Sequence, residues 1–592
     1  IFVVICNSHM KSLLSLLPYI KKYKKKLILG FIFIVLSISF SSLFPLIVGN
    51  GIDAIKSGVS SSQIIFYSGM AIVAALIGGF FLYMVRQHII VVSREIENDL
   101  RFDFFSHIVN MPRDFFNKNS TGNIMALATN DINSIREFVG PGIMYTVQTF
   151  FRTLLTVSVM LYINPFLAMV ALSPLPLISF IVYKVGRMTH ARSLKVKESF
   201  ADLTSKAQEN LSGIRVVKSY IREKNEISEF YDISRDYFRK NLSLAKVQSF
   251  SFPMMYLLTG VSLVLVIYFG GIEIINNRLT LGNLSTFLIY LGLLTWPMIA
   301  FGWIINLTQR AAPSMQRLMM VMNMKPDIAD NSETDNKITL ENIEGEIEFK
   351  NVSFKYPSGY TDVLKNINLK INKGTTLGII GHTGSGKTTL INLLSRIYDI
   401  SEGEILIDGK SIKQIPLRTL REAVGVVPQE SFLFSTSIEK NIAYSHDSLD
   451  YDKVIEAAKS ASLYKDVEQF PEKFQTVVGE RGITLSGGQK QRTSIARAIY
   501  KNPKVLILDD SLSAVDTHTE EEILNELKKV MKNRTSIIIS HRISSIKNAN
   551  NIIVLDGSII KEQGTHNELI SLGGIYYDLY QKQLLEEEIQ ES

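Results

Sequence analysis

The chain has 592 residues and is too long for one ordinary domain. Hydrophobic residues make up 46% of it and the mean hydropathy is +0.16. Because this apolar excess falls in the first half, we expect a membrane part followed by a soluble part. The net charge is +7, and much of the Lys and Arg lies near predicted membrane ends, which indicates positive-inside topology and no nucleic-acid binding. The one cysteine, Cys6, excludes an internal disulfide framework.

Six apolar stretches in the first half are each near the roughly 20 residues that a bilayer helix needs. They are Leu27–Val48, Ile64–Val91, Pro141–Ile163, Phe166–Val185, Phe252–Ile275 and Leu281–Leu307. The basic cluster at 21–26 places the N-terminus in the cytoplasm, unless it is simply a solvated helix face. The run Ile1–Cys6 lacks the charge and length of a signal peptide.

Long charged segments separate helix two from three and helix four from five. These segments, 93–140 and 186–247, are helical in character and rich in Arg and Lys, so we place them in the cytoplasm and the short loops outside. Helices two to five should therefore continue well beyond the membrane. Residues 1–324 are predicted to form an α-helical transmembrane domain of six helices.

Some polar and aromatic side chains fall inside these spans. Arg152 lies near the middle of the third, and Arg86 and His88 lie towards the inner end of the second. Since an intramembrane charge is costly, we expect Arg152 to face an inner cavity; the alternatives are a salt bridge between helices or snorkelling. Trp296, Phe301 and Trp303 could line a ligand cavity, but plain packing is the expected role.

The second half reads as a soluble α/β domain, 345–592, after a polar linker at 325–344. Its strongest motif, Gly381 to Thr388, fits the phosphate-binding loop G-x-x-x-x-G-K-[ST] between a short apolar strand and a helix. Glycines let several N–H groups converge on one point, where the helix N-terminus adds positive potential. Lys387 is expected to reach the β- and γ-phosphates, and Thr388 to bind Mg²⁺. The predicted ATP-binding residues of this motif are Gly381, Thr383, Gly384, Ser385, Gly386, Lys387, Thr388 and Thr389.

Two further motifs belong with this loop. The apolar run Val505–Asp509 ends in a carboxylate, which P-loop enzymes place beside Mg²⁺, so Asp509 is a predicted metal ligand. The run Leu485–Gln489 precedes a helix and offers a second set of N–H groups to a phosphate. Because one domain needs one such loop, the second should serve a nucleotide held by another copy. This predicts a dimer with ATP sandwiched between the domains.

The motif Leu485-Ser486-Gly487-Gly488-Gln489 resembles the signature of ATP-binding-cassette (ABC) proteins, and the whole chain resembles a bacterial exporter half-transporter. The resemblance implies six helices fused to one α/β nucleotide-binding domain. At this chain's own nucleotide, the resemblance implies that Tyr356 stacks on the adenine, that Gln429 contacts Mg²⁺ and senses the membrane part, and that His541 is the switch residue that contacts the γ-phosphate. It also implies an exporter X-loop at Glu480, a D-loop ending at Asp516, and contact of the partner's nucleotide by Ser486, Gly487, Gly488 and Gln489. The two coupling helices that it implies are Phe115–Thr121 and Gly213–Tyr220.

Asp510 departs from the family pattern. The family has Glu here as the base that polarises the attacking water, and Asp stands about 1 Å further back, where such a displacement can cost on the order of 100-fold in rate. Asp510 is therefore either a conservative, active acid or the mark of a degenerate site. The run Asp509–Asp516 resembles the Asp-bearing subunit of heterodimeric multidrug exporters, although His541, lost in some degenerate subunits, is retained.

These observations predict an ATP- and Mg²⁺-dependent exporter subunit in the bacterial cytoplasmic membrane. Its expected partners are a second half-transporter, membrane lipid and small hydrophobic or amphipathic compounds. The alternatives are a homodimer, a lipid or peptide translocase and, least favoured, an ATP-gated channel or regulator.

Overall fold

The computed structural model describes residues 10–58, 60–357, 359, 361–479, 485–512 and 517–591. They form two compact units. The helical unit comprises the chain up to Val109 together with Thr121–Met324. The α/β unit comprises Asn110–Ser120 together with the chain from Lys325 onward. A short segment from within the first half of the chain therefore packs with the second half.

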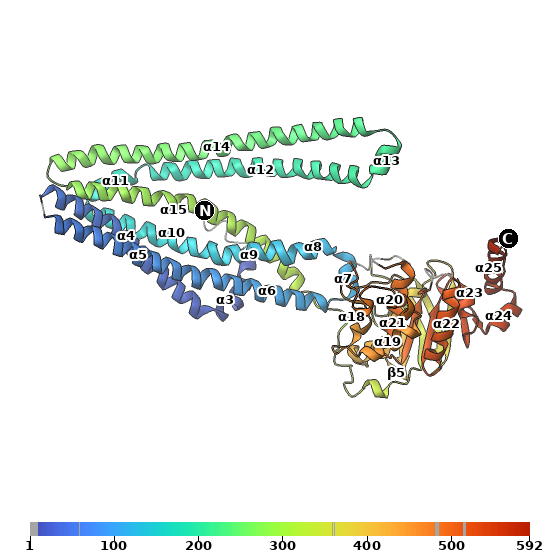
Figure 1. Ribbon diagram of the computed structural model, residues 1–592. Helices are drawn as coiled ribbons and strands as arrows, with labels where there is room; N and C mark the ends of the chain where they lie inside the picture. The colour runs from blue at the N-terminus through green and yellow to red at the C-terminus, as the bar shows by residue number, and fades with distance from the viewer. Residues whose placement is uncertain are drawn as a thin grey trace. The chain divides into compact units, whose positions relative to one another are not determined.

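The helical unit is built from long helices (Figure 1). In chain order its elements are α2 (Met10–Leu13), η1 (Leu14–Leu16), α3 (Leu17–Lys22), α4 (Lys24–Lys56), α5 (Ser61–Val85), η2 (Arg86–Ile90), α6 (Val91–Val109), α8 (Thr121–Ala126), η3 (Leu127–Asp131), α9 (Ile132–Glu137), η4 (Phe138–Gly142), α10 (Ile143–Ile163), α11 (Pro165–Leu172), α12 (Leu175–Ser212), α13 (Ile214–Ser219), α14 (Glu223–Ile275) and α15 (Leu281–Met322). Helices α12 and α14 form a long antiparallel hairpin with α13 at its tip.

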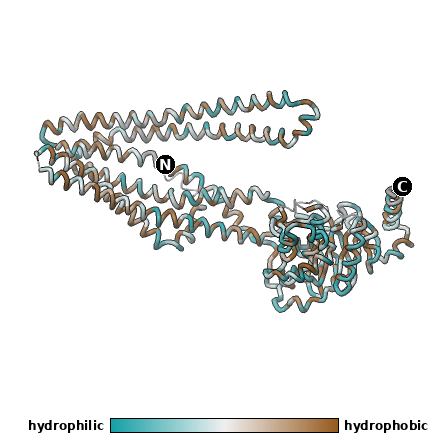
Figure 2. Tube along the Cα trace, viewed as in Figure 1, coloured by the Kyte–Doolittle hydropathy of each residue, from teal (hydrophilic) through white to brown (hydrophobic). Residues whose placement is uncertain are grey.

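Among the described residues, four helical runs are long and apolar enough to cross a membrane: Lys24–Lys56, Ser61–Val109, Thr121–Ile163 and Leu281–Met322. A shorter apolar run, Thr259–Ile275, lies in α14 on the fifth predicted span. The fourth predicted span is not one helix. It is divided between α11 and α12, because prolines at 174 and 176 lack the N–H that a continuous helix needs. Apolar residues recur along these helices in Figure 2.

Helices α4 and α15 meet closely near one end. A methyl group built on Gly282 would lie 2.0 Å from the carbonyl oxygen of Gly49, so neither position tolerates a side chain. The Gly282 N–H donates to Asp53 Oδ1 at 2.7 Å, and the Thr286 hydroxyl donates to the Pro45 carbonyl at 3.1 Å. Helix α4 is thereby fixed to α15 by polar contacts as well as by packing.

The α/β unit holds two sheets. The antiparallel sheet has the order β2-β1-β4-β5, and the larger sheet has the order β10-β9-β3-β8-β7-β6, in which only β10 is antiparallel to its neighbour. The strands are β1 (Ile347–Phe354), β2 (Leu364–Ile371), β3 (Thr376–Gly381), β4 (Glu402–Ile407), β5 (Lys410–Ser411), β6 (Val424–Val427), β7 (Val505–Asp509), β8 (Thr535–Ile539), β9 (Asn551–Asp556) and β10 (Ile559–Gly564). Strand β8 lies between β3 and β7, and Asp509 pairs with Ile539. The ends of β3 and β7 are thus brought to the same sheet edge.

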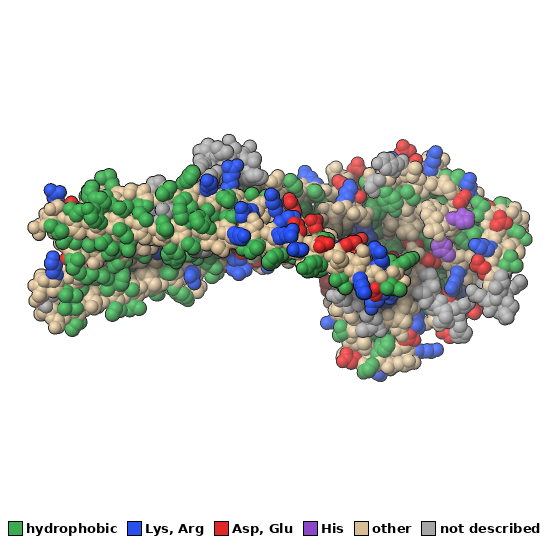
Figure 3. Space-filling view, turned by 90° about the horizontal axis from the view of Figure 1, so that it is seen from above, with side chains coloured by type: hydrophobic (Ala, Val, Ile, Leu, Met, Phe, Trp, Pro, Cys, Tyr) green, Lys and Arg blue, Asp and Glu red, His purple; other side chains and the backbone are tan. Residues whose placement is uncertain are grey.

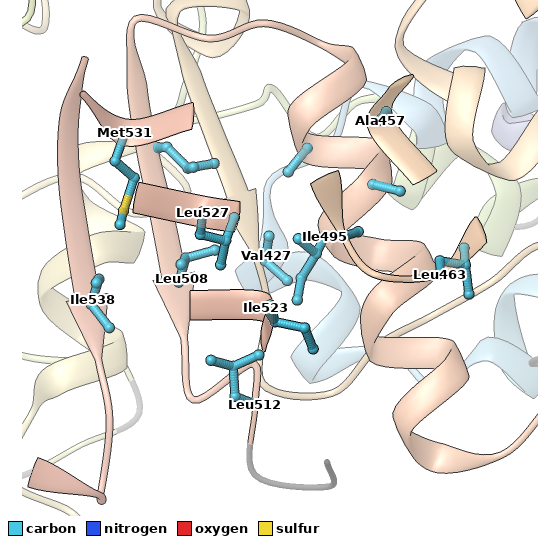
Figure 4. Close-up of a cluster of buried hydrophobic side chains, with 14 of the residues drawn as sticks. Val427, Ala457, Leu463, Ile495, Leu508, Leu512, Ile523, Leu527, Met531 and Ile538 are labelled. Carbon is cyan, nitrogen blue, oxygen red and sulfur yellow. The ribbon is translucent and has the colours of Figure 1, made fainter. Parts of the chain in front are cut away.

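The α/β unit also contains a set of mostly short helices. They are η5 (Leu340–Asn342), α16 (Lys387–Leu394), α17 (Leu417–Ala423), α18 (Ile438–Ile442), η6 (Ala443–Ser445), α19 (Tyr451–Ser460), α20 (Tyr464–Glu468), η7 (Lys473–Gln475), α21 (Gly487–Tyr500), α22 (Thr517–Met531), α23 (Ile543–Ile546), α24 (His566–Leu572) and α25 (Ile575–Glu591). Figure 4 shows Leu508 and Ile538 of the sheet in one cluster of buried side chains with Ile495, Ile523 and Leu527 of the helices. This hydrophobic core holds in place the ends of β7 and β8, which the polar side chains of the site follow.

Two connecting segments pack onto the α/β unit. Helix α7 (Arg113–Lys118) overlaps the first predicted coupling helix, and its Asn117 Nδ2 donates to Tyr398 Oη at 3.0 Å. The segment predicted to be a linker contains only the short η5 as regular structure, but its Ile338 and Ile343 are buried. Burial of these two side chains makes the segment part of the α/β unit.

Candidate nucleotide site

The predicted phosphate-binding loop connects β3 to α16. Gly386, with φ +99°, precedes the first residue of α16, and a Cβ there would lie 2.8 Å from Leu364 Cδ2 and 2.9 Å from the Val363 carbonyl oxygen. Gly384 also has a left-handed backbone, with φ +83°. Only glycine takes these conformations at no steric cost. The motif glycines therefore shape a tight turn at the start of a helix.

Lys387 is held inside this loop. Its side chain is buried, and Nζ donates to the carbonyl oxygens of Gly381 at 2.8 Å and His382 at 2.9 Å. Burial lowers the pKa of Lys387, while the negative charges of Asp510 and Asp509 act in the opposite direction. A phosphate is the kind of group that would offset this desolvation, since it would supply charge-assisted acceptors.

The Ser385 hydroxyl gives an independent indication of a ligand. Its oxygen is buried and has no hydrogen-bond partner among the described residues. A buried hydroxyl without a partner costs free energy, so a ligand atom is the expected partner. Together with the ammonium of Lys387 and the backbone of the loop, this hydroxyl fits an anionic phosphate.

Asp509 ends β7 beside the loop. It is buried, and the Thr388 hydroxyl donates to its Oδ1 at 3.3 Å. Burial raises the pKa of Asp509, and neighbouring Asp510 raises it further, while the Thr388 hydrogen bond, Lys387 and His541 lower it. A hydroxyl and a carboxylate are ligands that Mg²⁺ prefers, and a divalent cation here would favour the charged carboxylate. The structure brings together the two residues predicted to bind the metal.

Asp510 and Gln429 face each other at the same edge. Gln429 Nε2 lies 3.3 Å from Asp510 Oδ2, and the Asp510 N–H donates to the Ile539 carbonyl at 2.9 Å. Asp510 has φ +45°, a left-handed conformation that Asp and Asn adopt more readily than most residues. The acid predicted to polarise the attacking water is thus in contact with Gln429, the glutamine predicted to contact Mg²⁺.

Tyr356 contacts the first turn of α16. Its hydroxyl is 2.9 Å from Thr389 Oγ1, and its ring packs edge-on against Phe354 and Tyr398, with centroids 4.9 and 5.2 Å away. These contacts fix the ring beside the phosphate-binding loop. Tyr398 was missed by sequence reasoning, because no motif surrounds it.

His541 follows β8, and the C-terminal helix holds its backbone. Gln583 Nε2 of α25 donates to the His541 carbonyl at 2.6 Å, and Gln583 Oε1 accepts from the Ile543 N–H at 2.8 Å. Arg542 pairs with the buried Glu520. Neither Gln583 nor Glu520 carried a sequence signal, since each is far from His541 in the chain.

The predicted signature residues lie at the start of α21. Ser486 caps the helix in a capping box: Gln489 N–H donates to Ser486 Oγ at 3.2 Å, and Ser486 N–H donates to Gln489 Oε1 at 3.0 Å. Gln489 Nε2 also donates to Asp466 Oδ2 at 3.1 Å. Ser486 and Gly487 are exposed, and Gly488 is half-buried. Within the described residues, no hydrogen bond joins these four residues to the phosphate-binding loop. Glu480 and Asp516 lie outside the described residues.

The fold and the site together define a class of protein: membrane-spanning helices fused to a P-loop nucleotide-binding unit. Family models match as the ABC transporter transmembrane region over residues 27–298 and as ABC transporter over residues 364–513. The chain belongs to the ABC transporter family. It is an exporter in which the membrane region and the ATP-binding region are fused in one chain, and its ATPase activity is coupled to transport. It is located in the bacterial inner membrane, with the nucleotide-binding domain in the cytoplasm.

Relatives and a solved structure match along nearly the whole chain. The chain is 37% identical to the "Probable multidrug resistance ABC transporter ATP-binding/permease protein YheI" of Bacillus subtilis (strain 168), over 94% of each protein. It is 35% identical to an "ATP-dependent lipid A-core flippase" of Syntrophus aciditrophicus (strain SB), over 84% of this chain and 82% of that protein. A bacterial Atm1-family ABC exporter with ATP bound superimposes with a TM-score of 0.78 at 25% identity, over 94% of this chain and 99% of that chain.

Proposed function

We propose that the chain is one subunit of a dimeric exporter that uses Mg²⁺ and ATP to move hydrophobic or amphipathic compounds out of the cell. The observation that carries this proposal is a nucleotide site left incomplete within one chain. Lys387, Ser385 and Asp509 converge at one sheet edge, whereas Ser486 and Gly487 are exposed at another helix start. A second copy of such a unit would supply the missing N–H groups.

Each residue has one role in this proposal. Lys387 and the loop backbone bind the phosphates, and Tyr356 packs against the adenine. Thr388 and Asp509 hold Mg²⁺, with Gln429 as a further ligand, and the metal supplies charge neutralisation at the phosphates. Asp510 orients the attacking water, and His541 contacts the γ-phosphate. Ser486, Gly487, Gly488 and Gln489, with Asp516, contact the partner's nucleotide.

Coupling to the membrane is assigned to α7 and α13. Helix α7 contacts Tyr398 close to Tyr356, so movement in the nucleotide site can reach it. Helix α13 and the turn after it carry exposed apolar side chains, including Val216, Tyr220 and Ile221. Such a tip fits a hydrophobic recess on a partner subunit.

The first test replaces the ammonium by Lys387→Ala in the purified dimer. We expect ATP binding at this chain's site to be lost, because the main phosphate contact is gone. Lys373→Ala removes an exposed lysine paired with Glu344 and should bind ATP normally. Unchanged nucleotide binding and turnover in Lys387→Ala would refute the phosphate-site assignment.

We also propose that Asp510 impairs this site and that the dimer is a heterodimer whose other site is competent. In this case Asp510→Glu should raise ATP turnover by about 10- to 100-fold in the isolated chain, since the carboxylate would move about 1 Å towards the water. Asp510→Asn keeps the size and removes the base, so it should not show the increase.

The contrary result would be brisk turnover by the chain alone as a dimer, without gain in Asp510→Glu. That outcome would support a homodimer with a working Asp510. Co-purification of a second ABC protein from native membranes would support the heterodimer. Movement of lipid or peptide rather than small compounds would identify a translocase with the same ATPase.

A further inference from the structure

A cavity of about 170 Å³ is formed by residues of the helical unit alone. It is bounded by the junction of α5 and η2, by α10 and by the middle of α15. Its lining residues are Leu82, Arg86, Met144, Tyr145, Gln148, Thr149, Arg152, Trp296 and Pro297. At this size the cavity holds a small polar headgroup rather than a whole drug-sized molecule.

One face of α10 supplies most of the polar wall. Tyr145, Gln148, Thr149 and Arg152 follow the spacing of three and four residues that aligns side chains on a helix. Arg86 enters from the facing helix at the first position of the π turn η2. Such turns interrupt the regular register and are frequent at functional sites. Two guanidinium groups are therefore directed to one small space.

The charge in this space is unbalanced. No carboxylate is among the described residues that line the cavity, and neither Arg86 nor Arg152 forms an ion pair with any of the residues that the structure describes. Guanidinium groups only donate hydrogen bonds. Arg152 lies in α10, within a helical run long and apolar enough to cross a membrane, where an unpaired charge is costly and marks a functional site.

The remaining wall is apolar and aromatic. Trp296 is half-exposed at the cavity, and Tyr145 packs edge-on against Trp303 at 5.0 Å and against Trp296 at 6.5 Å. On the face drawn in Figure 3, hydrophobic side chains are spread along the helical unit, and Lys and Arg gather over one stretch. A ligand here would meet positive charge and apolar surface together.

We propose that this cavity binds the anionic headgroup of an amphiphile, a phosphate or a carboxylate, with its hydrocarbon part against Trp296 and Leu82. The inference rests on the proposed export function and narrows its substrate class to anionic amphiphiles. A cationic amphiphile would be repelled by Arg86 and Arg152. A neutral one would leave both guanidinium groups without an acceptor.

The chain offers its own optical probe. It has two tryptophans: Trp296 lines the cavity, and Trp303 packs against Tyr145 of the cavity wall. We would titrate the dimer, in nanodiscs of phosphatidylcholine at pH 8, with doxyl-labelled stearic acid and with its uncharged methyl ester. Tryptophan quenching by the acid should reach half its maximum at a mole fraction about tenfold lower than quenching by the ester.

In the variants Arg86→Gln and Arg152→Gln, the preference for the acid over the ester should fall about tenfold, so that acid and ester quench nearly alike. The corresponding Lys variants should keep part of the preference. Arg278→Gln, at an exposed arginine beside Glu273, should behave as wild type. A second arm compares doxyl-labelled phosphatidic acid with doxyl-labelled phosphatidylcholine. Stronger preference in this arm identifies a phospholipid headgroup, and stronger preference in the first arm a free carboxylate.

Equal quenching by acid and ester in wild type would overturn the proposal, as would an unchanged preference in both Gln variants. If one Gln variant fails to fold, the other and both Lys variants decide. Quenching requires no ATP. A protein that binds the anion but hydrolyses no ATP would refute the proposed export function alone, and a turning-over protein without anion preference would refute only this inference.

Discussion

Gln583 illustrates what a single side chain can do at a distance from its own motif. Its amide forms two hydrogen bonds with the backbone around His541: Nε2 donates to the His541 carbonyl at 2.6 Å, and Oε1 accepts from the Ile543 N–H at 2.8 Å. These two hydrogen bonds fix the backbone at residues 541–543, and therefore the direction from which the His541 imidazole approaches a phosphate. We regard Gln583 as a positioning residue for His541.

Replacement of this amide by Gln583→Leu should lower ATP turnover by about tenfold, since two hydrogen bonds of about 1 kcal/mol each no longer hold the loop. Nucleotide binding should be retained. The measurement is a double-mutant cycle with His541→Ala, in which Gln583→Leu should have little further effect.

Gln581→Leu, at an exposed position two residues earlier on α25, is the matched control and should turn over as wild type. Equal losses of turnover in the presence and absence of His541 would mean that Gln583 acts on stability alone.

Residues in contiguous motifs could be predicted from the sequence, and residues that support them could not. The structure brings Lys387, Thr388 and Asp509 together, because a loop and a strand end each carry their own geometric signature. Gln583, Glu520 and Tyr398 contact this region through folding of distant segments, and one sequence carries no record of such contacts. The roles of the motif residues in catalysis remain our proposal.

At the scale of elements, two helices begin with the same device. Ser486 with Gln489 caps α21, and Thr565 with Glu568 caps α24, each pair forming a capping box. The two boxes stabilise their helices by the same bonds, but only Ser486 belongs to the proposed signature. Comparison of the two capping boxes therefore separates the structural role of Ser486 as a helix cap from its proposed role at the nucleotide.

Ser486→Ala and Thr565→Ala should each lower the free energy of unfolding by about 1 kcal/mol, the usual value of an N-cap. In thermal unfolding the two variants should therefore look alike. In ATP turnover of the dimer they should differ, with a loss of about tenfold in Ser486→Ala and wild-type activity in Thr565→Ala. Identical turnover would reduce Ser486 to a helix cap.

Element boundaries show where periodicity is informative and where it is not. The apolar runs locate the long helices, because length and hydropathy are properties of the run itself. The division of the fourth predicted span into α11 and α12 depends on two prolines within an apolar run, and the strand order β9-β3-β8-β7 depends on contacts between distant segments. Burial of Ile338, in the segment predicted to be a linker, likewise depends on contacts with distant segments.

At the scale of the whole molecule, the exposed tip of the α12–α14 hairpin has to meet a partner if the chain works as a dimer. Val216→Glu places a charge on this apolar tip. We expect ATP binding to be retained, transport to fall, and transported compounds no longer to change ATP turnover, because a buried charge would weaken docking.

Ser219→Glu adds the same charge at an exposed polar position of α13 and should remain coupled. Transport and turnover are measured together in proteoliposomes. Full coupling in Val216→Glu would place the tip outside the transmission path.

The glycine contact between α4 and α15 limits how the helical unit can deform. Backbone meets backbone where Gly49 faces Gly282, and Asp53 and Thr286 fasten the two helices on either side. Neither helix can slide or rotate there without breaking these contacts, so this end should move as one rigid piece. Any rearrangement must then be absorbed elsewhere along the helices, which makes this joint a pivot whose position is set by the absence of two side chains.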